Sequence, residues 1–257
     1  MRVIHFFSLG LIMGCLSTVQ AGPLPVDNYS FENPVIIFDP EAYPVDIWVT
    51  GWTKIDPSYQ NTGVFLNLPG SPTYITNAVG NQLAFICNLQ DIALAQDTNL
   101  VYQAGSLYRL VVGVYYSVIA PPPPGDYLTL VLYYHDETGP HDIASTRVYR
   151  ESLGINLLRN FSVNLPKVSA GDAWAGKQIG IALRGSGENG GFWDVDNVRL
   201  WENPPDFDNN NLVDLVDLAA MAGEWLSTTN PNTDLTGDGT VNLLDLQVLQ
   251  QYWLENL

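Results

Sequence analysis

The C-terminal part of the sequence contains Asp206-Phe-Asp-Asn-Asn-Asn-Leu-Val-Asp-Leu-Val-Asp217 and then, in the same register, Asp234-Leu-Thr-Gly-Asp-Gly-Thr-Val-Asn-Leu-Leu-Asp245. Side chains that carry oxygen stand at positions 1, 3, 5, 9 and 12 of both stretches. Position 6 is Gly239 in the second stretch and Asn211 in the first, and these residue types adopt a positive φ angle most readily. Each stretch is therefore expected to turn sharply and to gather its oxygen atoms around one point.

This spacing is that of an EF-hand loop, in which alternate side chains and one backbone carbonyl surround a calcium ion. The sequence therefore predicts two calcium ions. The expected direct ligands are the side chains of Asp206, Asp208, Asn210 and Asp217 with the Leu212 carbonyl, and those of Asp234, Thr236, Asp238 and Asp245 with the Thr240 carbonyl. Asp214 and Asn242, at position 9, are expected to reach the ion through water. A solvated acidic turn would explain one such loop more easily than two in register.

Each loop is followed by apolar residues at the spacing of an amphipathic helix, over 215–225 and 246–254. Prolines and asparagines at 203–205 and 229–232 argue against a helix before either loop. A duplicated loop–helix unit with Asp at position 12 closely resembles a type I dockerin, over residues 206–257. The resemblance implies a small all-α calcium-binding module that docks onto a cohesin-type partner, on a scaffold or surface protein.

Positions 10 and 11 of the two loops are the candidate partner-binding residues, Leu215, Val216, Leu243 and Leu244. The dockerins best known for cohesin binding often carry Ser-Thr there, so the resemblance does not identify the partner. One interpretation is that these pairs pack between the two helices. The other is that they form two matching exposed patches, so that either copy docks the same partner in orientations related by half a turn.

The charge and the N-terminus limit the partners and the location. The 257 residues carry a formal net charge of −17, which argues against nucleic acid and anionic membrane surfaces as partners. Residues 1–21 are predicted to be a secretory signal, with an apolar run too short to span a bilayer. The alternative is a lipoprotein box that leaves a lipidated Cys15. No other segment is apolar enough for a membrane span, so we expect a protein that is secreted or held at the cell surface.

Residues 22–202 are predicted to form one all-β domain, because apolar runs alternate with Gly, Pro, Asn and Asp turns. The clearest strands are expected at 106–118, 127–136, 145–151, 157–165, 178–184 and 192–201. Cys87 remains as a lone cysteine after removal of the signal and is expected to be buried. Residues 203–205 are expected to link this domain to the dockerin.

Three stretches carry a second resemblance: Asn28-Tyr-Ser-Phe-Glu-Asn-Pro34, Gln103-Ala-Gly-Ser-Leu-Tyr-Arg-Leu110 and Trp193-Asp-Val-Asp-Asn-Val-Arg-Leu200. They resemble the jelly-roll β-sandwich of carbohydrate-binding modules and galactose-binding-like domains, and also a calcium-dependent cyclase family with this fold. In such domains the first and last strands lie side by side, often bridged by a structural calcium. The resemblance thus implies Glu32 and Asp196 as ligands of a third calcium ion; the alternative is an edge turn with solvated carboxylates.

Strand alternation predicts a candidate glycan-binding face. If one face of 107–118, 127–136 and 178–184 is buried, the opposite face gathers aromatic and basic side chains around small residues. Aromatic rings stack on pyranose rings, and Arg and His donate to hydroxyl groups. The predicted ligand-binding residues are Arg109, Tyr115, Tyr133, His135 and Arg184. The alternative is an ordinary half-solvated sheet face.

Catalytic motifs are sparse in this sequence. It contains no Gly-x-Ser-x-Gly elbow, no His-Glu-x-x-His and no phosphate loop. The His135–Asp142 cluster is centred on a Thr-Gly-Pro turn and is expected to be a hairpin tip. We therefore expect a non-catalytic protein that binds a glycan and docks onto a cohesin-type partner in polysaccharide binding or degradation. The alternatives are an enzyme on the jelly roll, either a polysaccharide hydrolase or lyase or a calcium-dependent cyclase, and a structural surface protein.

Overall fold

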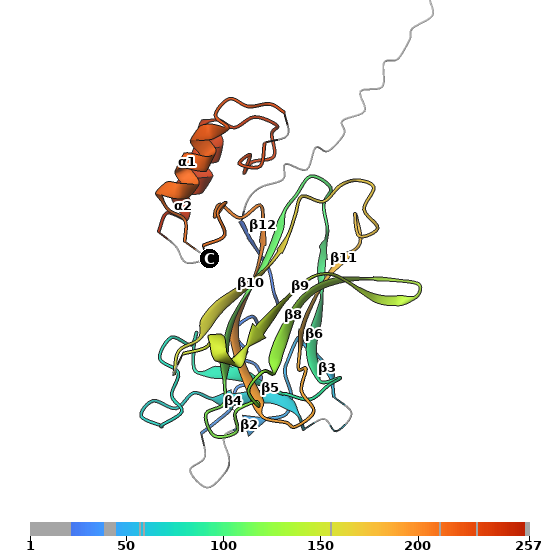
Figure 1. Cartoon of the computed structure of the whole chain (residues 1–257), viewed down its shortest axis with the longest axis vertical. Coiled ribbons are helices and arrows are strands. Elements are labelled where there is room, and N and C mark those ends of the chain that lie inside the picture. The colour runs from blue at the N-terminus through green and yellow to red at the C-terminus, as the bar shows by residue number, and fades with distance from the viewer. Residues whose placement is uncertain are drawn as a thin grey trace, which may run out of the picture.

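The computed structural model describes residues 22–38, 45–56, 58, 60–154, 156–210, 212–229 and 231–254. The predicted signal segment and Cys15 lie outside the described residues. The main body is a β-sandwich of two antiparallel sheets, followed by two short helices (Figure 1). The predicted jelly-roll class with a small helical C-terminal module is confirmed.

The seven-stranded sheet has the order β10-β7-β12-β5-β4-β2, with β1 paired to β12. Its strands are β1 Gly22–Leu24, β2 Val45–Asp46, β4 Thr62–Leu66, β5 Gln82–Cys87, β7 Tyr108–Tyr116, β10 Arg159–Leu165 and β12 Phe192–Glu202. The five-stranded sheet has the order β3-β6-β11-β8-β9. Its strands are β3 Thr53–Ile55, β6 Ala93–Val101, β8 Tyr127–Asp136, β9 Gly139–Tyr149 and β11 Gln178–Arg184; a short 3-10 helix, Arg150–Ser152, follows β9.

The core lies between the two sheets and follows the predicted alternation. Leu110, Val112 and Val114 of β7 pack in one cluster with Leu128 and Leu130 of β8. Alternate residues face the partner sheet, as a pleated strand requires, except at bulges such as the one between Asp196 and Arg199 of β12. The opposite side of each sheet therefore faces solvent or other parts of the chain. Cys87 is buried, as expected.

The C-terminal module contains α1, Leu215–Gly223, and α2, Leu243–Gln251. Each helix begins directly after a predicted calcium loop, with Asp214 or Asn242 as N-cap and a reciprocal capping box with Asp217 or Asp245. In the described parts of 203–205 and 229–232 there is no helix before either loop. None of the described helices has the length and apolar character needed to span a membrane.

Residues 203–205, which were predicted to be a linker, are packed against the β-sandwich. The Leu107 amide donates to the Asn203 side chain at 2.9 Å, and the Asn203 amide donates to the Leu107 carbonyl at 2.9 Å. Pro204 and Pro205 are buried. Figure 1 shows α1 and α2 at one end of the sandwich, with β2 and β4 at the opposite end. The two modules therefore form a continuous structure.

Candidate active site and calcium loops

A cavity of about 440 Å³ opens on the outer face of the seven-stranded sheet. Its walls are mainly apolar and aromatic, and they include Phe65, Phe85, Tyr115, Val118, Ile119 and Phe192. Asp194 is the only ionisable side chain among the lining residues apart from the tyrosine. A concave, mostly apolar cavity with a few polar groups is the usual form of a small-molecule site.

Asp194 is buried in β12, opposite Phe85 on one side and Tyr115 on the other. No described residue donates a hydrogen bond to its carboxyl group, and burial raises the pKa of Asp194 to about 8. The carboxyl group is therefore mostly protonated at neutral pH and can donate a hydrogen bond or a proton. The Tyr115 hydroxyl is already engaged, since it accepts from the Asn156 amide at 2.9 Å.

The absence of a side chain at Gly63 positions the Phe85 ring, which lines the cavity. Gly63 of β4 lies opposite Phe85, and a Cβ atom at Gly63 would meet the Asp46 carbonyl oxygen at 2.3 Å and the Phe85 ring at 2.8 Å. The Phe85 and Phe192 rings are packed edge to face, with centroids 5.7 Å apart. Only glycine at position 63 therefore lets the Phe85 ring lie over β4.

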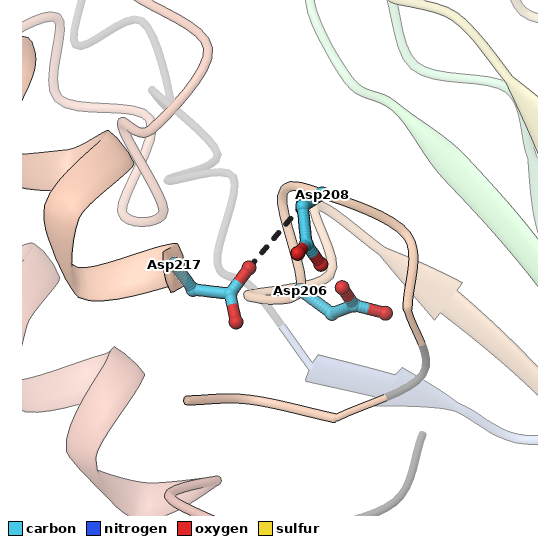
Figure 2. Close-up of side chains that lie close together, drawn as sticks. All are labelled: Asp206, Asp208 and Asp217. Atoms are coloured by element: carbon cyan, nitrogen blue, oxygen red, sulfur yellow. Dashed lines mark hydrogen bonds between the residues drawn. The ribbon is translucent and has the colours of Figure 1, made fainter. Parts of the chain in front are cut away.

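The first calcium loop brings three predicted ligands together. Single carboxylate oxygens of Asp206, Asp208 and Asp217 lie within 4.8 Å of one another, and Figure 2 shows them where the loop meets α1. Asp217 also accepts from the amides of Phe207 at 2.5 Å, Asp208 at 3.3 Å and Asp214 at 2.9 Å. Three carboxylates held this closely repel one another unless a cation lies between them, so the donor set fits a hard cation.

The second loop repeats these hydrogen bonds, but among the described residues only the first loop has three carboxylates within 4.8 Å of one another. Asp245 accepts from the Thr236 and Asn242 amides at 2.9 and 2.8 Å, as Asp217 does in the first loop. Gly237 and Gly239 have φ angles of 69° and 91°, and Asn209, the first-loop counterpart of Gly237, has a φ of 64°. The structure also describes the other predicted loop residues, Asn210, Leu212, Asp214, Asp238 and Thr240. Asn211 lies outside the described residues.

Glu32 and Asp196 both hold the turn before β5. Glu32 accepts from the Asn81 and Gln82 amides at 2.9 and 2.8 Å, while Asp196 accepts from the Val79 amide at 2.6 Å. Burial, with a smaller contribution from the nearby Glu32 carboxylate, raises the pKa of Asp196 to about 7. The Val198 amide donates to the Tyr29 carbonyl at 2.8 Å, so the opening and closing segments lie side by side, as the resemblance implied. A third calcium ion here stays a prediction.

The prediction of one glycan-binding face was wrong, because its residues lie on opposite sides of the molecule. Arg109 and Tyr115 are on the seven-stranded sheet, whereas Tyr133, His135 and Arg184 are on the five-stranded sheet. Arg109 is 2% exposed and lies under the C-terminal module, and Tyr115 is 1% exposed. Consecutive strands usually lie side by side, but β7 and β8 are joined by a proline-rich segment that crosses from one sheet to the other.

On the five-stranded sheet, each of the remaining three residues contacts an aspartate of the same sheet. The Tyr133 ring covers Gly180, and its hydroxyl donates to Asp97 at 2.8 Å. Arg184 donates to both carboxylate oxygens of Asp142, at 2.6 and 2.9 Å. His135 lies 3.3 Å from Asp97. Tyr133 is thus a packing residue, while His135 and Arg184 stay accessible.

The four predicted partner-binding residues are exposed on the C-terminal module. Leu215, Val216, Leu243 and Leu244 are 69%, 52%, 66% and 52% exposed. The interior position is taken instead by Met221 of α1 and by Val248 and Leu249 of α2. The interpretation that these pairs pack between the helices is therefore wrong, since each lies on the solvent side of the first helical turn.

A sequence model of the HpiC1-like family, described as HpiC1 cyclase, matches residues 22–201. The chain belongs to this HpiC1-like family. A type I dockerin model matches residues 204–254, so the cyclase-family domain is followed by a dockerin, and dockerins bind calcium and dock onto cohesins. No curated protein matches the chain.

Solved structures of this fold include an apo-form cyclase from Fischerella sp., with 21% identity and a TM-score of 0.56 over 72% of this chain and 98% of that chain. A Stig cyclase from Fischerella sp. TAU, in complex with (3Z)-3-(1-methyl-2-pyrrolidinylidene)-3H-indole, has 21% identity and a TM-score of 0.57 over the same shares. A CBM4 carbohydrate-binding module reaches a TM-score of only 0.41, with 12% identity over 69% and 99%. The two cyclase structures support the fold of the cyclase-family domain.

Asp194 is the residue that sequence reasoning missed in the cyclase-family domain. On a strand, an acid between Trp193 and Val195 is expected to face solvent. It does face away from the core, but the cavity walls come from segments around 65–73, 117–119 and 192–194 that only the fold brings together. The single sequence signal was an acidic residue in a strand whose paired positions are aromatic.

Proposed function

We propose that the β-sandwich is a small-molecule cyclase in which Asp194 is the general acid. The observation that carries this proposal is the buried Asp194 carboxyl group, without a described hydrogen-bond donor, in a cavity of aromatic and aliphatic side chains. The family match supports a cyclase over the glycan-binding function that the sequence favoured.

The chemistry follows from the cavity walls. A protonated Asp194 transfers its proton to an unsaturated, largely apolar substrate, and a new ring forms as electron density moves to the cation that results. The faces of Phe85, Phe192 and Tyr115 lower the energy of that positive charge, and the apolar walls keep out water that would trap it. Loss of a proton from the cyclic product to the Asp194 carboxylate restores the acid.

A direct test uses 4-(1H-indol-3-yl)butan-2-one, which is bound in a crystal structure of a cyclase from Fischerella sp. TAU. Its ketone oxygen can accept a hydrogen bond from Asp194, and its indole ring can lie among the phenylalanines. Calorimetry should show saturable binding that Asp194→Leu weakens about tenfold or more, because a buried hydrogen bond to the ketone is lost. Tyr149→Ala, on the other sheet, is the matched control and should bind normally.

Proton transfer is tested separately in heavy water. Mass spectrometry should detect deuterium incorporated into carbon-bound positions of the bound probe. Asp194→Asn should reduce this incorporation much more strongly than it reduces binding of the probe. Binding that is equal in the wild type and in Asp194→Leu would contradict the proposed site. Equal incorporation in the wild type and in Asp194→Asn would contradict the role of Asp194 as an acid.

The dockerin is proposed to bind two calcium ions through the loop residues named above and to attach the cyclase-family domain to a cohesin-type partner outside the cell. The clustered carboxylates of Asp206, Asp208 and Asp217 support the calcium. The exposure of Leu215, Val216, Leu243 and Leu244 supports the docking surface. Glu32 and Asp196 are proposed to hold a third, structural calcium. Secretion by the 1–21 segment fits an extracellular partner.

A second candidate function is glycan binding at the outer face of the five-stranded sheet. The specific observation is an accessible aromatic and basic group: Tyr149 is 43% exposed and lies beside Tyr127, and the Arg147 guanidinium lies 4.6 Å from the Tyr127 ring centroid. Arg184 and His135 lie on the same sheet. Such a platform suits stacking against a sugar ring.

Under this second function, Tyr149→Ala should reduce retention on insoluble polysaccharide by roughly 0.5–1.5 kcal/mol of binding free energy, the usual value of a stacking ring beyond its buried area. Affinity electrophoresis in soluble polysaccharides gives the same comparison. Phe85→Ala, inside the cavity of the other sheet, is the control and should be retained normally. Unchanged retention of Tyr149→Ala on every polysaccharide that holds the wild type would exclude this face.

A further inference from the structure

Arg109 extends from β7 into the first calcium loop of the dockerin. Its Nε donates to Asn164 Oδ1 at 2.8 Å, and Nη2 donates to the Asp206 carbonyl at 2.7 Å and to the Asn209 side chain. Its Nη1 forms an ion pair with Asp206 Oδ2. The Arg109 and Asp206 side chains are 3% and 0% exposed, so this ion pair is closed off from water.

The apolar surroundings hold Arg109 in place. Val111, two residues along β7, and Trp201 of β12 share one hydrophobic cluster with Val213, Met221 and Leu249 of the dockerin. The Trp201 and Tyr252 rings are packed edge to face, with centroids 5.3 Å apart. The first loop is therefore fixed to the sandwich, and Arg109 cannot leave Asp206 without breaking this interface.

The two loops differ in the partners of the carboxylate at position 1. Asp206 and Asp234 both occupy position 1, but Asp234 accepts hydrogen bonds from the Gly237 and Gly239 amides of its own loop, each at 2.8 Å. Among the described residues no ion pair joins a basic side chain to Asp234, Asp238 or Asp245. The first loop thus has a buried guanidinium group of the sandwich on its position-1 carboxylate, whereas near the second loop Lys167 of the sandwich donates to the Pro231 carbonyl at 3.1 Å, three residues before Asp234.

We propose that Arg109 is a built-in counter-cation of the first calcium loop, which keeps that loop folded on the sandwich without calcium and lowers its calcium affinity below that of the second loop. This inference rests on the proposed calcium binding by both loops. The affinity of such loops depends on the charge of their ligands and on their rigidity.

The contacts of Asp206 explain the direction of the effect. Arg109 binds Oδ2 of Asp206, and Oδ1 accepts the Asn210 amide of the loop at 3.2 Å, so an ion bound by this carboxylate lies close to the guanidinium group. A calcium ion and the guanidinium group would then share one carboxylate in a dry environment, where like charges repel strongly. Without calcium, Arg109 offsets part of the repulsion among Asp206, Asp208 and Asp217.

The test is a calorimetric titration of calcium into the calcium-stripped full chain. The wild type should bind in two phases; Asp217→Asn should remove the weaker phase, and Asp245→Asn the tighter one. Arg109→Met should tighten the weaker phase about tenfold or more, because the repelling charge is gone. Arg109→Lys keeps the charge and should keep the weaker phase weak, while Arg159→Met is the control for net charge and should change neither phase.

Three outcomes would overturn the inference: a weaker phase that Asp245→Asn removes, an Arg109→Met variant whose weaker phase is unchanged or weakened further, or an Arg109→Lys variant that tightens as much as Arg109→Met. An absence of calcium binding in the wild type would instead contradict the proposed function of the loops. Far-ultraviolet circular dichroism of the stripped proteins adds an independent readout, since Arg109→Met should lose more helix without calcium than the wild type does.

Discussion

Asp194→Asn should be more stable than the wild type at alkaline pH, and the advantage should grow as the pH rises. Asp194 has no described hydrogen-bond donor, and burial raises its pKa from 3.8 to about 8. The folded protein therefore resists ionisation of this group. An asparagine of nearly the same shape does not ionise, so it avoids that cost.

The direction follows from linkage between protonation and folding. Because the pKa of Asp194 is higher in the folded state than in the unfolded state, its contribution to stability is fully present below pH 3.8 and is lost as the pH rises through about 8. Each pKa unit corresponds to about 1.4 kcal/mol, so the whole loss is on the order of 5 kcal/mol. Urea unfolding at pH 5 and pH 8.5 should show the difference between variant and wild type widening by several kcal/mol.

Glu151→Gln is the matched control for this measurement. Backbone hydrogen bonds, including one from the Gly125 amide, hold the pKa of Glu151 below its usual range, so its contribution is present above the unfolded pKa and is lost only in acid. Its stability difference from the wild type should therefore stay nearly constant between pH 5 and pH 8.5. A constant difference for Asp194→Asn as well would mean that the Asp194 carboxyl group ionises normally, and would remove the argument for a neutral acid in the cavity.

Local patterns of the sequence predicted the parts of the fold that depend on short-range spacing. The calcium loops follow from oxygen atoms at fixed positions, and β8 and β11 follow from strict alternation, with the predicted bounds of 127–136 and 178–184 observed. The hairpin tip at Thr138 was also predicted, and β8 ends at Asp136 while β9 begins at Gly139. In each case the information lies within about a dozen neighbouring residues.

The wrong and missed residues depend on contacts between distant segments. Alternation shows that Arg109 faces away from the core, but not that Asp206, far along the chain, covers it. The same alternation places Tyr115 and Tyr133 outward without showing that their strands belong to different sheets. Asp194 lies in a cavity whose walls include segments around 65–73 and 117–119, both distant from it in the sequence. Periodicity within one strand contains none of this information.

The outer face of the seven-stranded sheet contacts the dockerin at one end and carries the cavity at the other. On β7, Arg109 and Val111 lie under the dockerin, while Tyr115 lines the cavity at the other end of the strand. A strand advances about 3.4 Å per residue, so roughly 20 Å separates the two positions. The dockerin and the cavity therefore occupy separate parts of this face, which is compatible with the proposed attachment to a partner.

Replacing Leu215-Val216 and Leu243-Leu244 together by Ser-Asp should abolish binding to a cohesin-type partner, whereas replacing either pair alone should leave affinity nearly intact. The two pairs occupy equivalent positions at the starts of α1 and α2 and are all more than half exposed. The Leu254 amide donates to the Val213 carbonyl and the Leu226 amide to the Val241 carbonyl, each at 2.8 Å. Each repeat is thus closed by the end of the other, and the module presents two similar apolar ends.

Surface plasmon resonance against a panel of cohesin domains measures this directly. Each single-pair variant keeps one intact apolar end, so it should lose no more than about half of its binding modes, a factor of two or roughly 0.4 kcal/mol. The double-pair variant has only polar, charged ends and should not bind, while its calcium titration stays like that of the wild type because positions 10 and 11 supply no ligand. A single-pair variant that loses all binding would show that only one end docks, which is the result expected if contact of the first loop with Arg109 leaves the two ends unequal.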